Sequence, residues 1–284
     1  MPIDPAKALG ADLGATPAEW VEDDVILYHL GLGAGNPPTD PNELGYTYEG
    51  NLKVLPSFGV IPVFGALGSV ASIPGLEFNP AMLMHGEQDL VVHRPLPTAA
   101  KVSTSGRVAG VYDKGKAALV IIETDTADDR GEPLFTNRFS LFIRGEGGFG
   151  GDAGPKAGNE PPDREPDIRI ESPTLPQQAL IYRLSGDKNP LHADPGFSAL
   201  GGFDRPILHG LCTYGVVCKA VVDTVLGGDV TRVARYQVRF AGVVFPGETI
   251  VTSVWRDGDD RLVVAASTKE RQAAAISNAA IELR

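Results

Sequence analysis

The sequence predicts an α+β fold made of two similar halves. One observation is a stretch rich in glycine, proline and charge at 145–167, which cannot build a core and divides the chain into segments 1–144 and 168–284. A second is a strongly periodic helix in the later segment, followed by alternating strands. A third is that parts of the earlier segment repeat the later one. We therefore expect two tandem α+β units joined by a linker.

The second half contains the clearest elements. A helix is expected from about His209 to Leu226, ended by Gly227-Gly228. Polar and apolar residues then alternate over 235–240, and strands at 249–255 and 262–267 flank a turn that begins at Asp257. A last strand is expected at 275–283. One face of the helix carries Leu211, Tyr214, Cys218, Val221, Val222 and Val225.

The first half repeats this order with one difference. The segment 96–105 resembles 245–254, and the turn at 113–116 resembles that at 257–260. However, the region Pro56–Pro74, where the helix should recur, is interrupted by prolines and glycines. A full central helix is therefore not expected there.

Composition limits the classes of partner. The 284 residues are 43% hydrophobic and carry a net charge of −11, with basic residues scattered singly, so nucleic acid is not an expected partner. The longest apolar run, 60–73, is interrupted by Pro62, and the N-terminus lacks a signal-like apolar core. No membrane insertion and a cytoplasmic location are expected. Cys212 and Cys218 would point to different helix faces and are expected to be small buried hydrophobes.

The stretch 182–195 concentrates polar chemistry. Asp187, Asn189 and His192 place a carboxylate, an amide and an imidazole within six positions, beside a turn-forming Asn-Pro. Such a group can hold and deprotonate a water. The first half keeps the Tyr, Leu and Asn-Pro frame at 28–37, but Ala34 and Thr39 stand where Asp187 and His192 would be. The frame is thus structural, and the proton-transfer groups occur in the second half.

This stretch, with 206–211, resembles the hydratase-2 motif of the MaoC-like (R)-specific enoyl-CoA hydratases. The resemblance covers nearly the whole chain and implies a double hotdog fold, in which a curved antiparallel sheet wraps a central helix twice. It implies an acyl-CoA substrate, a homodimer, and no metal or redox cofactor. It also implies that Asp187 and His192 bind one water and that Asn189 orients the water or an acid–base partner.

Two further residues follow the motif. The N–H of Gly210 is the expected oxyanion donor, because the first amides of a helix are unpaired and the helix dipole favours negative charge there. His209 is expected to cap the helix or to lie in the core rather than to transfer a proton. Asp194 is expected to cap the segment after His192. A metal site built from Asp187, His192, Asp194 and His209 is conceivable by ligand type but would be uncommon in this family.

Several residues are candidates for substrate contact. His85 resembles the start of the long central strand of the family's first repeat and is expected to shape the pocket. Arg183, Lys188 and Arg205 flank the motif and could meet coenzyme A phosphates or simply be solvated. Phe58 and the apolar residues of Pro56–Pro74 could receive a long or bulky acyl chain, or could close an ordinary core.

The leading hypothesis is a hydro-lyase that interconverts trans-2-enoyl-CoA and (R)-3-hydroxyacyl-CoA. A (3R)-hydroxyacyl carrier-protein dehydratase shares the chemistry, although the negative net charge disfavours an acidic partner. Acyl-CoA thioesterases share the fold, because fold alone does not fix function. Thioesterases of this fold usually place an acid residue on the central helix, whereas here the candidate groups precede it. A non-catalytic acyl-CoA binding module would not explain why the acid–base groups survive in one half.

Overall fold

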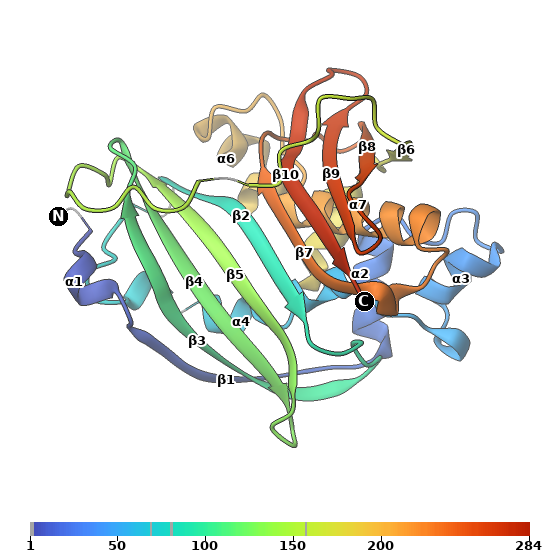
Figure 1. The fold of residues 1–284 in the computed structure, drawn as a ribbon, viewed down its shortest axis with the longest axis horizontal. Helices are drawn as coiled ribbons and strands as arrows, with labels where there is room; N and C mark the ends of the chain where they lie inside the picture. The colour runs from blue at the N-terminus through green and yellow to red at the C-terminus, as the bar shows by residue number, and fades with distance from the viewer. Residues whose placement is uncertain (1–2, 69, 80–81, 157) are drawn as a thin grey trace.

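A single antiparallel sheet of ten strands joins both halves of the chain (Figure 1). The computed structural model describes residues 3–68, 70–79, 82–156 and 158–284. The strand order is β1-β3-β4-β5-β2-β7-β10-β9-β8-β6, so each half contributes five neighbouring strands. The two sets run outward from a shared centre in corresponding order. The repeat seen in the sequence is therefore also a repeat in space.

The first half is mostly sheet with short helices. Its central helical region is broken into η2, α4 and η3, as the prolines and glycines predict. The strands are β1 (Asp12–Trp20), β2 (Leu83–Val92), β3 (Ala100–Asp113), β4 (Ala117–Asp128) and β5 (Pro133–Arg144). The helices within the described residues are α1 (Pro5–Ala8), α2 (Glu22–Gly31), α3 (Pro41–Thr47), η1 (Glu49–Asn51), η2 (Pro56–Val60), α4 (Phe64–Leu67) and η3 (Val70–Ser72).

The second half contains the long helix, α7 (Gly210–Val225), within one residue of its expected ends. Gly227 and Gly228 follow it with positive φ, as helix-ending glycines do. The expected strands are confirmed as β7 (Val233–Phe240), β8 (Thr249–Arg256), β9 (Arg261–Thr268) and β10 (Ala274–Leu283), and β6 (Ile168–Pro173) is additional. The remaining helices are α5 (Gln178–Tyr182), η5 (Arg183–Ser185), η6 (Pro190–His192), α6 (Pro195–Leu200) and η7 (Val230–Arg232).

The two halves meet where β2 pairs with β7. The pairing runs from Glu87 opposite Arg239 to Val91 opposite Arg235. A bidentate ion pair crosses this seam, with the Arg235 guanidinium 2.7 and 2.8 Å from the two carboxylate oxygens of Asp89. Main-chain hydrogen bonds and charge therefore both hold the halves together.

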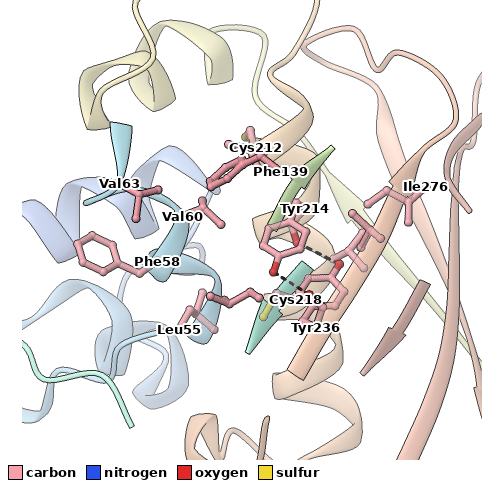
Figure 2. Packing of buried hydrophobic residues seen from close by; sticks show 14 of the residues in the cluster. Leu55, Phe58, Val60, Val63, Phe139, Cys212, Tyr214, Cys218, Tyr236 and Ile276 are labelled. Carbon is pink, nitrogen blue, oxygen red and sulfur yellow. Dashed lines mark hydrogen bonds between the residues drawn. The ribbon is translucent and has the colours of Figure 1, made fainter. Parts of the chain in front are cut away.

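Helix α7 packs against residues of both halves. A Cβ on Gly215 would lie 2.5 Å from a Leu32 methyl and 2.7 Å from the Tyr28 hydroxyl, so only glycine permits this close approach of α7 to α2. Figure 2 shows Leu55 and Val60 of the first half on the side of Cys218 and Tyr214 of α7, with the Phe58 ring directed away from that helix, and all of them belong to one core. Both cysteines are free and buried, as expected. The Tyr214 and Tyr236 rings stack at 4.2 Å, and each hydroxyl donates to the other residue's carbonyl at 3.3 Å.

The segment 145–167 has no helix or strand among its described residues and crosses the outside of the sheet (Figure 1). It is fixed at several points rather than loose. The Asn159 amide donates to Gln237 at 3.0 Å, Asn278 donates to the Gly158 carbonyl at 2.8 Å, and the Trp255 indole donates to the Arg164 carbonyl at 2.9 Å. The segment therefore acts as a strap over the seam.

Candidate functional site

The motif forms a tight loop between α5 and α6. The Asp187 carboxylate accepts the Asn189 main-chain N–H at 3.0 Å, and the Asn189 amide oxygen accepts the Leu191 N–H at 3.0 Å, so two successive turns are stabilised by side chains. Asn189 is the N-cap of η6, which delivers His192 to the interior. Asp194 caps α6 through the N–H groups of Gly196 and Phe197, as expected. The turn chemistry of the loop thus places Asp187 and His192 on the same side.

His192 is buried with a defined tautomer. Its Nδ1 lies 2.8 Å from the carbonyl oxygen of Ile207. Because a carbonyl only accepts, Nδ1 carries the proton and Nε2 keeps its lone pair. Burial lowers the pKa of His192, while the Ile207 carbonyl and the Asp187 charge act in the opposite direction. The ring is therefore neutral near pH 7, with Nε2 available as a base.

His209 lies beside both groups. It occupies the N-cap position of α7 but makes no side-chain capping hydrogen bond, so a core position is confirmed and capping by its side chain is wrong. Its ring stacks on His192 with a centroid distance of 3.7 Å. Its Nε2 lies 3.2 Å from the carbonyl oxygen of Asp187, to which it donates. Burial, with the nearby charge of His192, lowers the pKa of His209 to about 3.

Asp187, His192 and His209 each present a ligand atom within 4.8 Å of the others. Two hydrogen bonds of about 2.8 Å that meet at one water can span such a separation. A metal ion would need ring lone pairs that converge, whereas the two imidazole planes are stacked 3.7 Å apart at 27°, so lone pairs that lie in these planes converge poorly on one point. Asp194, the fourth candidate ligand, is engaged in capping. The arrangement suits a shared water better than a metal.

Gly210 is the first residue of α7 and is exposed, as an oxyanion donor requires. The described residues offer no acceptor to its N–H, which therefore points out of the helix start with the positive end of the dipole. A Cβ on Gly210 would lie 3.3 Å from the Phe240 ring, so a larger residue would press on that ring. Gly210 combines a free donor with close access to the backbone.

His85 reaches the site from the first half. The register of β2 shifts between His85 and Glu87, and such a bulge redirects a side chain. The His85 ring contacts Phe240 at 4.9 Å and Phe139 at 5.4 Å between centroids. Burial lowers the pKa of His85 to about 4, against the opposing charge of Asp187. The placement agrees with a residue that shapes the pocket.

The flanking cations are placed differently from one another. Arg183 folds back so that its Nη2 donates to the Lys188 carbonyl at 3.1 Å, and its charge lowers the pKa of His192 and of His209. Lys188 is exposed on the loop. Arg205 is exposed after α6, and its guanidinium lies 4.6 Å from the centroid of the Phe245 ring. Arg183 is part of the loop, while Lys188 and Arg205 face outward.

The structure corrects the expectation that Phe58 contacts the substrate. Its side chain is 1% exposed and packs edge-on against Trp20 and Tyr28, each at 5.5 Å between ring centroids, so it lies in the core and not at the site. A first-half residue that does border the motif is Phe64, which is half-buried on α4. A Cβ on Gly186 would lie 3.2 Å from its ring. Nothing in the local sequence marks Phe64, because the contact joins segments more than a hundred residues apart.

Family models match both halves. The model described as MFE-2 hydratase 2 N-terminal domain matches residues 19–145, and the model described as MaoC like domain matches residues 157–279. The enoyl-CoA hydratase ChsH3 of Mycobacterium tuberculosis is 46% identical over 278 residues, covering 97% of each chain. The peroxisomal enoyl-CoA hydratase 2 of Arabidopsis thaliana is 42% identical, covering 93% of this chain and 90% of the relative.

Solved structures agree on the fold. A MaoC-like dehydratase from Phytophthora capsici superposes with a TM-score of 0.87 at 33% identity, covering 99% of this chain and 98% of that one. A Mycobacterium tuberculosis protein described as having a double hotdog fold superposes at 0.59 with 14% identity, covering 100% of this chain and 98% of that one. The α+β double hotdog expected from the sequence is therefore confirmed. Within the described residues, no helix combines the length and apolar character needed to cross a membrane.

The likeness extends over almost the entire chain, at identities well above those at which only a fold is shared. It includes both repeats, the degenerate first and the motif-bearing second. The chain belongs to the MaoC-like family of hydro-lyases, in the group of two-repeat enoyl-CoA hydratases 2.

Proposed function

We propose that this protein reversibly hydrates trans-2-enoyl-CoA to (R)-3-hydroxyacyl-CoA in fatty-acid or related acyl-CoA metabolism. The observation that carries the proposal is the pairing of the Asp187 carboxylate with a ring nitrogen of His192 within 4.8 Å, in one of two otherwise similar repeats. The hydrogen bond from Nδ1 of His192 to the Ile207 carbonyl leaves the lone pair on Nε2. The relatives named enoyl-CoA hydratase support the same reaction.

The mechanism follows from the donors and acceptors present. Asp187 and His192 bind one water and remove its proton as the hydroxide adds to C3 of the substrate. The same pair then delivers that proton to C2 on the same face, so no net proton is taken up or released. The Gly210 N–H donates to the thioester oxygen as it gains enolate charge. Asn189, by holding the turn, keeps Asp187 directed at the water.

Every step of this mechanism uses side chains, a backbone amide and the substrate, so we propose that no metal or redox cofactor takes part. Lys188 and Arg205 are the better candidates for a coenzyme A phosphate, because both are exposed and neither makes an ion pair among the described residues, whereas Arg183 folds back onto the loop. The homodimer and the cytoplasmic location stay predictions.

The function and its stereochemistry can be tested together with crotonyl-CoA. We expect the enoyl absorbance to fall with no release of free thiol, since hydration keeps the thioester and hydrolysis does not. A coupled (S)-specific 3-hydroxyacyl-CoA dehydrogenase should form no NADH, because the expected product is the (R) alcohol. Free thiol would indicate a thioesterase, and stoichiometric NADH would contradict the (R) assignment. Crotonyl carried by acyl carrier protein, assayed in parallel, separates the dehydratase alternative.

We further propose that the acyl chain leaves the site past Phe64. Phe58, Val60 and Val63 fill the core, so the void that a missing helix would leave is closed at those positions. Ile61, Pro62, Phe64 and Leu67 remain half-buried and apolar, and the Phe64 ring of this group borders Gly186 of the motif. They form a surface on which a chain could lie while the thioester stays at Asp187.

Variants of Phe64 should therefore change chain-length preference. Wild-type kcat/KM is expected to rise from four carbons toward longer enoyl-CoAs, with an upper limit of about fourfold per methylene, which corresponds to ~0.8 kcal/mol of burial. Phe64→Trp should lower the ratio of sixteen-carbon to four-carbon kcat/KM, and Phe64→Ala should raise it. Phe149→Ala, a half-buried phenylalanine of the strap, serves as the matched control and should leave the ratio unchanged. A wild-type peak at four carbons with steep loss beyond eight would refute the path.

A further inference from the structure

One histidine contacts both of the proposed acid–base residues but is not itself proposed to transfer a proton. We propose that His209 is a positioning residue that fixes Asp187 and His192 relative to each other. Its Nε2–H holds the main-chain carbonyl of Asp187 at 3.2 Å, and its ring lies against the His192 ring at 3.7 Å. This inference rests on the proposed function, because it assigns a part in the same reaction.

The contacts of His209 differ from those of a histidine that only fills a core. His29, the fully buried histidine of the first half, satisfies both ring nitrogens: Nδ1 lies 2.9 Å from the Tyr46 carbonyl, and the Leu55 N–H donates to Nε2 at 3.3 Å. His209 is 1% exposed, yet its Nδ1 has no hydrogen-bond partner among the described residues. Leaving a buried acceptor unpaired is unfavourable, so a histidine at this position lowers the stability of the fold. Its one side-chain hydrogen bond and its closest ring contact both lead to the acid–base pair.

The position in the chain explains how His209 can do this. It directly precedes Gly210, so it lies at the start of α7, a helix of 16 residues whose side chains are mostly buried. The motif loop, by contrast, consists of short turns from Gly186 to Ala193. A hydrogen bond and a ring stack from the start of this long helix therefore tie the loop to it. The same residue then sets the distance from the water-binding pair to the oxyanion donor.

The stack also requires His209 to stay uncharged. The charged groups around it are Asp187, Arg183 and, when protonated, His192, and the Tyr182 ring contacts it at 4.9 Å. If His209 carried a proton on both nitrogens, a second positive charge would lie against His192 and oppose protonation of that ring. A neutral His209 leaves His192 free to accept the proton of the water.

Two substitutions separate the two contacts. His209→Gln keeps an N–H that can donate to the Asp187 carbonyl but removes the ring. His209→Phe keeps a ring against His192 but removes the donor. With crotonyl-CoA, we expect kcat to fall about 10-fold for His209→Gln and about 10²-fold for His209→Phe. A small misplacement of a catalytic group lowers the reaction rate by factors of this size. KM should stay within about threefold, because His209 does not contact substrate.

Histidine tautomers provide a second readout, because the two contacts proposed for His209 require one defined protonation state. The chain contains five histidines, so side-chain ¹⁵N spectra are tractable. At pH 7 His209 should be neutral with the proton on Nε2, and His192 neutral with the proton on Nδ1. A doubly protonated His209 at pH 7 overturns the proposal. If a folded variant turns over crotonyl-CoA within threefold of wild type, the contact that this variant removes does not position the acid–base pair.

Controls distinguish this inference from the function on which it rests. His93→Gln makes the same change at an exposed histidine outside the site and should have wild-type kinetics. Thermal melting of each variant shows whether it is folded. If His209→Phe is not folded, the kcat of His209→Gln still tests the positioning role. Wild-type protein that fails to hydrate crotonyl-CoA would refute the proposed function. Active wild type together with fully active His209 variants would refute only the positioning role.

Discussion

Replacing Asp187 with Asn should reduce turnover of crotonyl-CoA by at least about 10²-fold, the usual contribution of a positioned acid–base group. Asn retains the size of the side chain and can still accept the Asn189 N–H that Asp187 accepts at 3.0 Å, so the loop should keep its turn. What is lost is the negative charge beside the water. His192→Gln should have an effect of similar size, because it removes the Nε2 lone pair. Initial rates of enoyl absorbance loss give both values.

The double variant decides whether the two residues act as a unit. If they share one water, removing the second group should cost far less than removing the first. Asp194→Asn is the matched control: the same change at a helix N-cap, where Asn caps as well as Asp. Near wild-type turnover by Asp187→Asn, or strictly multiplicative losses in the double variant, would contradict the shared water.

Acid should destabilise the fold well above the range in which carboxylates titrate. Burial lowers the pKa of His29 and His85 to about 4 and that of His209 to about 3, from 6.5 in an exposed histidine. Between pH 6.5 and about 4 these histidines are protonated in the unfolded chain but stay neutral in the native state. The free energy of unfolding should therefore fall as pH falls, by at most about 1.4 kcal/mol per pH unit for each histidine. Urea midpoints at pH 7, 6 and 5 measure the trend.

The contribution of one ring can be isolated. His29→Gln should lower stability at pH 7, because its two main-chain contacts are not fully replaced, but the loss between pH 7 and pH 5 should be smaller than in wild type. Buried carboxylates such as Glu123 and Glu248, whose pKa values are lowered by arginine partners, add their own loss only below about 4.5. An unfolding free energy that is flat from pH 7 to pH 5 would contradict the assignment.

The parts of the fold that were predictable depend on local pattern. Helix α7 was marked by its apolar face and by the glycines after it, and the broken helix of the first half was marked by Pro56 and Pro62. The motif was predictable for the same reason, since Asp187, Asn189 and His192 lie within one loop whose turns are made by their own side chains.

The parts that were not predictable depend on long-range pairing. His85 meets Phe240 only because β2 pairs with β7 and because the register of β2 shifts beside it. Phe64 meets the motif only because α4 is tucked against the loop of the other half, and Phe58 was misplaced for the same reason. The stack of His209 on His192 requires the whole turn from η6 to α7. No spacing rule within either segment encodes these distances.

The seam between β2 and β7 also bears on whether either half can exist alone. If the chain were divided in the strap, each fragment would present a central strand as a bare edge, with Glu87–Val91 on one and Arg235–Arg239 on the other. Long unpaired strand edges promote non-native association, so fragments produced separately should precipitate. Co-expressed fragments should instead associate through the β2–β7 pairing. Any activity they regain should require both, because the motif comes from one fragment and Phe64 and His85 from the other.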